Sequence, residues 1–171
     1  MRLTTALLAF ATGALAMPSG TTGNEPSKVV ARAVATHTII VSNEGFSRGD
    51  FKANAEDILE FHFKPGSHSV TQTSFRNPCR YLSGGFASGT VVTSRGVWEN
   101  EQVFQVTLQD ESPVWFYQAG DKTCSGHGFV GVVNAPQTNG QYYGNFQRAA
   151  LQKATTELIV LPAVGSFVTL D

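Results

Sequence analysis

Short runs in which apolar and polar residues alternate dominate the chain from residue 36 onward. In the segment 57–64, Leu59, Phe61 and Phe63 alternate with polar neighbours, and the segment 101–110 repeats the same period. A period of two places successive side chains on opposite faces of a β-strand. Further candidate strands, rich in β-branched and aromatic residues and bounded by Gly, Pro, Asn or Asp, are 36–43, 69–75, 113–119 and 128–134. The pattern predicts an all-β sandwich whose strands each have one core face and one solvent face.

Two stretches of the chain do not read as strands of this sandwich. Residues 76–100 form a long, glycine-containing loop. After Pro136 the sequence predicts a linker, one short helix near 144–157 and an apolar tail. The tail has an alternative interpretation, in which it adds a strand to the edge of the sandwich.

The N-terminal 16 residues have the pattern of a secretory signal peptide. Arg2 precedes an apolar run that ends in small residues at Ala14 and Ala16, and the run is shorter than the roughly 20 residues of a membrane span. We therefore expect a secreted, extracellular protein without a membrane span. The expected organisation is a signal peptide (1–16), a flexible leader (17–35), a β-sandwich domain (36–136) and a C-terminal extension (137–171).

Charge and motif content exclude several classes of function. The 12 Lys and Arg residues nearly balance the 13 Asp and Glu residues, and no basic run attracts nucleic acid. The chain has no His-Glu-x-x-His motif. Its paired carboxylates, Glu56/Asp57 and Asp110/Glu111, lie at turns or strand boundaries, where solvated charge is the simplest interpretation. We therefore expect no enzyme activity.

Two cysteines, Cys79 and Cys124, are present in the expected mature region. An oxidising secretory route favours a disulfide between them, and free thiols or a two-cysteine metal site are the alternatives. A disulfide that closes so long a loop stabilises a fold by about 4 kcal/mol in the chain-entropy model.

Three ordered segments carry a family resemblance that covers residues 37–136. They are GFSRGDFKANAEDILEFHFKPGSHSVTQTSF, NPCRYLSGGFASG and SPVWFYQAGDKTCSGHGFVGVVN. This combination resembles the fungal extracellular cupredoxin-like proteins, which are relatives of the plant phytocyanins. The resemblance implies a cupredoxin-like Greek-key β-sandwich with one disulfide.

The same resemblance locates the positions of the copper ligands. His68 falls on the first histidine ligand of the family, whereas Gln118, Thr123 and Phe129 fall on the cysteine, the second histidine and the axial methionine. A type 1 site requires a thiolate and two imidazoles, and an amide oxygen does not replace a thiolate. The resemblance therefore implies a vestigial copper site, and we expect no cofactor.

A nearby histidine leaves one metal-binding alternative open. The loop that contains His127 is one residue longer than in the family, so its imidazole could turn toward His68. Two histidines can bind Cu(II) or Zn(II) weakly. In this alternative the protein is an extracellular copper-binding protein or an oxidase auxiliary with a modified His68/His127 site. The other two histidines, His37 and His62, are interpreted as structural.

Several aromatic residues are candidates for a shallow binding cleft. Trp98, Trp115 and Tyr117 would line it beside the vacated copper position, although core packing is the competing role for these rings. A cell-wall glycan, a phenolic ligand or another secreted protein would be the partner. The sequence thus favours a non-enzymatic binding or interaction module at the fungal cell wall or host interface, with an effector role as a further possibility.

Overall fold

The computed structural model describes residues 32–158 and 163–170. The chain divides into two units, 1–32 and 33–171, and every assigned helix and strand lies in the second unit. The expected signal peptide and the leader up to residue 31 lie outside the described residues. No helix in the described part of the chain is long and apolar enough to cross a membrane.

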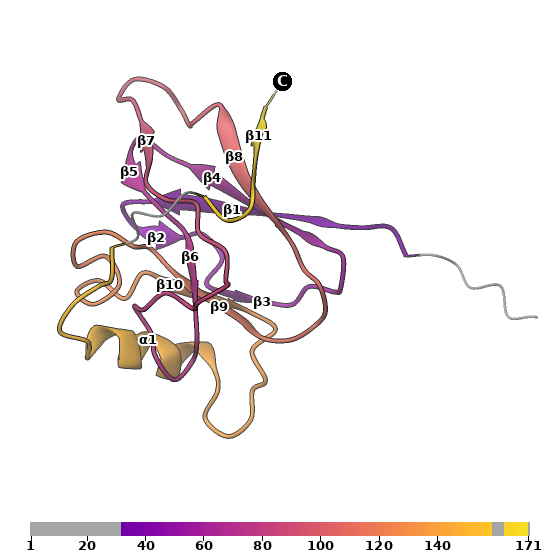
Figure 1. Cartoon of the computed structure of the whole chain (residues 1–171), viewed down its shortest axis with the longest axis vertical. Helices are drawn as coiled ribbons and strands as arrows, with labels where there is room; N and C mark the ends of the chain where they lie inside the picture. The colour runs from indigo at the N-terminus through magenta and orange to yellow at the C-terminus, as the bar shows by residue number, and fades with distance from the viewer. Residues whose placement is uncertain (1–31, 159–162, 171) are drawn as a thin grey trace, which may run out of the picture. The chain divides into compact units, whose positions relative to one another are not determined.

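The strands form two larger sheets and one small ribbon (Figure 1). The first sheet has the order β11 (Ser166–Thr169), β8 (Gln102–Thr107), β4 (Ile58–Phe63), β1 (Thr36–Ser42) and β2 (Gly45–Phe46). The second has the order β3 (Asp50–Phe51), β10 (Val130–Val133), β9 (Val114–Tyr117) and β6 (Thr71–Thr73). The ribbon pairs β5 (Gly66–His68) with β7 (Val91–Thr93). Strands β1 and β4 are parallel, as are β3 and β10, and the other pairs are antiparallel.

The core between the two larger sheets follows the alternation read from the sequence. Leu59, Phe61 and Phe63 of β4 are fully buried. The Phe61 ring lies 5.5 Å from Phe116 of the second sheet and 6.4 Å from Phe104 of β8. Removing one such buried ring typically costs about 3–5 kcal/mol. The predicted β-sandwich with one disulfide and a short C-terminal helix is confirmed.

The outer face of the second sheet departs from the prediction of one wet face per strand. Helix α1 (Tyr143–Leu151) packs on it, with the Phe146 ring 4.6 Å from Trp115. Every residue of β10 is buried as a result. The helix is shorter than the predicted range 144–157 because the chain turns after Gln152, where the Lys153 amide donates to the Ala150 carbonyl. Strand β10 is therefore buried on both faces because α1 packs on it. The alternation of residues within a strand cannot predict this packing.

The apolar C-terminal tail forms a strand at the edge of the first sheet. Strand β11 pairs antiparallel with β8, and Phe167 lies opposite Phe104 with their rings 5.2 Å apart. The alternative interpretation of the tail as an added edge strand is therefore confirmed. The pairing covers backbone groups of β8 that would otherwise form an open edge.

Candidate functional site

Two of the four family ligand positions meet inside the protein. His68 ends β5, and Gln118 directly follows β9; their exposed fractions are 4% and 1%. The His68 Nδ1 and Gln118 Oε1 atoms are 3.3 Å apart. The end of β5 and the end of β9 thus bring a histidine and an amide together inside the protein.

The amide of Gln118 is fixed by a second partner. Its Nε2 donates a hydrogen bond to the Ser42 carbonyl at 2.9 Å, so its oxygen is the atom that faces His68. A carbonyl oxygen accepts hydrogen bonds only, so a hydrogen bond between these two atoms has His68 Nδ1 as its donor. The other ring nitrogen, Nε2, lies 3.4 Å from the Pro65 carbonyl oxygen. Both nitrogens of the His68 ring thus face oxygen atoms of the protein.

Thr123 has a role in loop structure at the position of the second histidine. Its hydroxyl lies 2.6 Å from the Gln118 carbonyl oxygen and accepts a hydrogen bond from the Gly120 amide at 2.8 Å. These contacts close the turn that follows β9. Because backbone groups hold this hydroxyl, it does not take the place of an imidazole ligand.

Phe129 places hydrocarbon at the position of the axial methionine. Its carbonyl accepts a hydrogen bond from the Gln118 amide at 3.0 Å, so it stays adjacent in the fold to the cysteine position. Its ring packs so closely on Gly45 that an added Cβ there would lie 3.1 Å from the ring. Gly45 has φ of +102°, a backbone conformation that glycine adopts readily.

His127 lies in the loop after β9, and in the described part of the chain no hydrogen bond, ion pair or ring contact joins it to His68. Its side chain is exposed and stacks on Phe129, with ring centroids 5.3 Å apart. Within residues 32–158 and 163–170, no group of three or more His, Cys, Asp and Glu side chains is arranged to hold a metal ion. To bind one metal ion together, the rings of His68 and His127 would have to leave their contacts with Gln118 and Phe129.

A cavity of about 210 Å³ adjoins His68 and Gln118. Ser67, Thr90 and Leu158 contribute to its walls. Leu158 is 58% exposed and belongs to the segment 152–158, which we call the C-terminal strap. The strap therefore borders the vestigial site.

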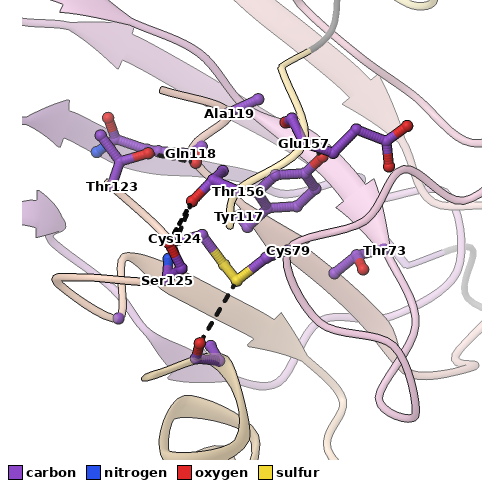
Figure 2. Close-up of a disulfide and its surroundings, with 12 residues drawn as sticks. Thr73, Cys79, Tyr117, Gln118, Ala119, Thr123, Cys124, Ser125, Thr156 and Glu157 are labelled. Carbon is purple, nitrogen blue, oxygen red and sulfur yellow. Dashed lines mark hydrogen bonds between the residues drawn. A yellow bond between two sulfur atoms is a disulfide. The ribbon is translucent and has the colours of Figure 1, made fainter. Parts of the chain in front are cut away.

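The disulfide between Cys79 and Cys124 is formed, as expected (Figure 2). Both residues are fully buried, and their Cα atoms are 5.6 Å apart. The strap is tied to this region, since Thr156 accepts a hydrogen bond from the Ser125 amide at 3.0 Å. The disulfide thus joins the loop that follows β6 to the loop that follows β9, and hydrogen bonds attach the strap to both loops.

Three groups of Glu157 form hydrogen bonds that attach the strap to the rest of the domain. Its amide donates to the Cys79 carbonyl at 3.0 Å, and its carboxylate accepts from the Tyr81 amide at 2.9 Å. Its carbonyl accepts from the Tyr117 hydroxyl at 3.2 Å (Figure 2). Burial, and secondarily the Glu157 charge, raise the pKa of Tyr117, which keeps this hydroxyl protonated as a donor.

The expected aromatic cleft is not formed by the three residues named for it. Trp115 and Tyr117 are 5% and 0% exposed and belong to the core beneath α1. Trp98 is 80% exposed and lies on the loop between β7 and β8, with the Lys64 ammonium 3.8 Å from its ring centroid. The reason is that α1 covers the face of β9 that the alternation of residues predicted to be open.

Two polar groups, the buried Asp57 and the half-buried Glu157, were not recognised as important in the sequence. Asp57 is fully buried and accepts hydrogen bonds from the Ala35 and Asn54 amides at 2.9 Å, which corrects its interpretation as a solvated carboxylate. His37 lies 2.9 Å from the same carboxylate, in keeping with a structural role. Glu157 gave no signal because its partners are distant in sequence.

Comparisons with known proteins find two relatives in one fungus and a solved structure of low similarity. No family model matches the chain. The chain is 27% identical over 124 residues to the protein named "Probable GPI-anchored cupredoxin-1" of Arthroderma benhamiae, covering 71% of this chain and 62% of that protein. It is 32% identical over 112 residues to an "Extracellular serine-rich protein" of the same fungus, covering 62% of this chain and 41% of that protein. The chain thus spans less than two thirds of the length of either relative.

A solved structure with a related arrangement is auracyanin A, a blue copper protein of the bacterium Chloroflexus aurantiacus. The match has a TM-score of 0.38 and 12% identity, and it covers 58% of this chain and 98% of that one. The chain is thus a β-sandwich with one disulfide that is similar in sequence to a protein named as a fungal cupredoxin. Its curated relatives are fungal proteins described as GPI-anchored or extracellular.

Proposed function

We propose that this cupredoxin-like protein is a secreted, non-enzymatic binding module that has lost type 1 copper. The observation that carries the proposal is the hydrogen-bonded pair of His68 and Gln118. Position 118 supplies an amide where electron transfer needs a covalent thiolate, and that amide holds the remaining imidazole through its Nδ1 hydrogen. In this role the former copper site stabilises the sandwich.

The proposed location is the fungal cell wall or the interface with a host. The names of the two fungal relatives, one GPI-anchored and one extracellular, support an extracellular location. A stable sandwich closed by a disulfide suits an oxidising environment. A role in binding requires a surface that can receive a ligand, and the described residues offer several open cavities.

Copper analysis of the purified, oxidised protein tests this proposal. After incubation with excess Cu(II) and desalting, the protein should show no intense blue absorption and far less than one copper per chain. A stoichiometric copper signal that His68→Ala abolishes would instead establish the copper-binding alternative. His62→Ala is the matched control, because His62 contacts Glu60 at 2.7 Å and lies outside the family ligand positions.

A further inference from the structure

A larger cavity, of about 520 Å³, opens away from the vestigial copper site. It receives lining residues from both larger sheets: Val106 and Leu108 come from β8 and the turn after it, and Val114 comes from β9. Its volume falls within the range of about 300–1,000 Å³ that is typical of small-molecule sites. None of the family ligand positions lines it.

The lining of this cavity combines polar side chains with an apolar part. In the apolar part, Phe86 and Leu108 are 7% and 3% exposed, whereas Val106 and Val114 are only partly buried and pack against the core. The partial exposure of the two valines leaves apolar surface that a small ring would cover.

Gln72 supplies an oriented polar group to the same cavity. Its Oε1 accepts a hydrogen bond from the Phe86 amide at 3.1 Å, which fixes the orientation of the side-chain amide. Its Nε2 has no hydrogen-bond partner among the described residues. The cavity therefore combines apolar surface at Val106 and Val114 with a preoriented donor, which suits a hydroxyl oxygen as acceptor.

Charge at the cavity favours a neutral ligand. Asp110 lines it, and its carboxylate accepts a hydrogen bond from the Ser112 amide at 2.7 Å. Hydrogen bonds from the Ser112 side chain and amide lower the pKa of Asp110, so the group is anionic at neutral pH. No Lys or Arg is found among the described residues that line the cavity. A ligand with its own carboxylate would meet repulsion and no cationic partner.

We propose that this cavity binds a small neutral phenol or aromatic alcohol, with its ring against Val106 and Val114 and its hydroxyl at Gln72. The proposal rests on the proposed role as a binding module, and it does not depend on the loss of copper. A neutral oligosaccharide is the competing ligand class. It is disfavoured because the aromatic ring in the lining, Phe86, is too buried to offer a stacking face.

Binding of 4-hydroxybenzyl alcohol tests the site, measured by saturation-transfer NMR and calorimetry on the full secreted chain. Val164 lines the cavity and is 43% exposed, so Val164→Trp should fill the opening and weaken binding at least tenfold. Val168→Trp is the matched control, because Val168 is 41% exposed and does not line the cavity. No binding by the parent protein, or equal loss in the two variants, would overturn the assignment.

A comparison of a neutral ligand with an anionic one tests the effect of charge at the cavity. The parent should bind 4-hydroxybenzyl alcohol more tightly than 4-hydroxybenzoate, and Asp110→Asn should narrow that preference by roughly threefold to tenfold. An unchanged preference, or tighter binding of a β-glucan oligosaccharide than of the phenol, would contradict the proposal. Copper analysis of the same samples is independent, so failure of phenol binding leaves the test of copper loss intact.

Discussion

His68 Nδ1 and Gln118 Oε1 face each other at 3.3 Å where a cupredoxin would hold a metal between an imidazole and a thiolate. The glutamine extends the contact to the Ser42 carbonyl on the other side, so one amide connects β1, β5 and the end of β9. A side-chain hydrogen bond of this kind contributes about 1 kcal/mol to stability. The connection that a metal would provide is thus made by protein groups alone.

The first prediction concerns the stability that Gln118 supplies. Gln118→Ala should lower the free energy of unfolding by roughly 2–3 kcal/mol, because it leaves His68 and the Ser42 carbonyl without their partner and opens a cavity. Urea unfolding followed by fluorescence measures the change. Gln109→Ala serves as control, since Gln109 is exposed and should shift stability by less than about 0.5 kcal/mol. Equal effects of the two substitutions would refute a bridging role.

The second prediction concerns the disulfide. Cys79 and Cys124 are separated by 45 residues, and the chain-entropy model assigns about 4 kcal/mol to a loop of that length. The Cys79→Ala/Cys124→Ala variant should lose stability of that order, as judged by its urea midpoint. The same denaturation in the presence of a reductant should bring the parent protein to the level of the variant. A midpoint that reduction does not change would show that the packing of α1 and the strap is sufficient.

The third prediction concerns the buried carboxylate of Asp57. Asp57→Asn should cost about 2–3 kcal/mol, because the new amide nitrogen would face backbone donors such as the Asn54 amide. The exposed Asp121 provides the matched control, and Asp121→Asn should leave stability nearly unchanged. Thermal unfolding of the pair gives the comparison. Similar melting temperatures would mean that Asp57 is exchangeable for any polar group.

The fourth prediction concerns stability at high pH. Burial raises the pKa of Tyr117 above the ordinary value of 10.0, so the folded protein keeps a proton that the unfolded chain releases. The stability contribution is complete below pH 10 and is lost as the pH rises beyond it. Unfolding midpoints at successive pH values should therefore fall above pH 10 in the parent and less in Tyr117→Phe.

Tyr142→Phe is the control for that titration. Tyr142 is 43% exposed, and the variant should keep the decline of the parent above pH 10. If Tyr117→Phe declined as steeply as the parent, the titration would belong to another group. The free energy of unfolding of Tyr117→Phe should also be lower by about 1 kcal/mol at neutral pH, because this variant lacks the hydrogen bond to the Glu157 carbonyl.

The core of the sandwich could be predicted from the sequence because its signal is local. The alternation of Leu59, Phe61 and Phe63 specifies one buried face whatever lies opposite. The same reasoning failed for Trp115 and Tyr117, whose second face is buried by a helix that begins more than twenty residues later. Periodicity reports the face that a strand buries, and it does not report what covers the other face.

The contacts of the candidate site could not be predicted from the sequence. The family resemblance named His68 and Gln118, but it did not indicate that the amide would orient toward Ser42 as well. Glu157 and the strap were not foreseen, since the resemblance ends before them. Contacts between segments that are distant in sequence depend on tertiary packing, and no local pattern encodes them.

Restoring the family ligands tests the central claim most directly. Copper content and visible absorption should be compared between the parent protein and the Gln118→Cys/Thr123→His/Phe129→Met variant, both refolded oxidised and incubated with Cu(II). The account predicts a colourless parent and a blue variant that holds about one copper per chain. A parent that is itself blue or binds one copper tightly would contradict the loss of type 1 copper. A folded triple variant that stays colourless would contradict the assignment of these positions as former ligands.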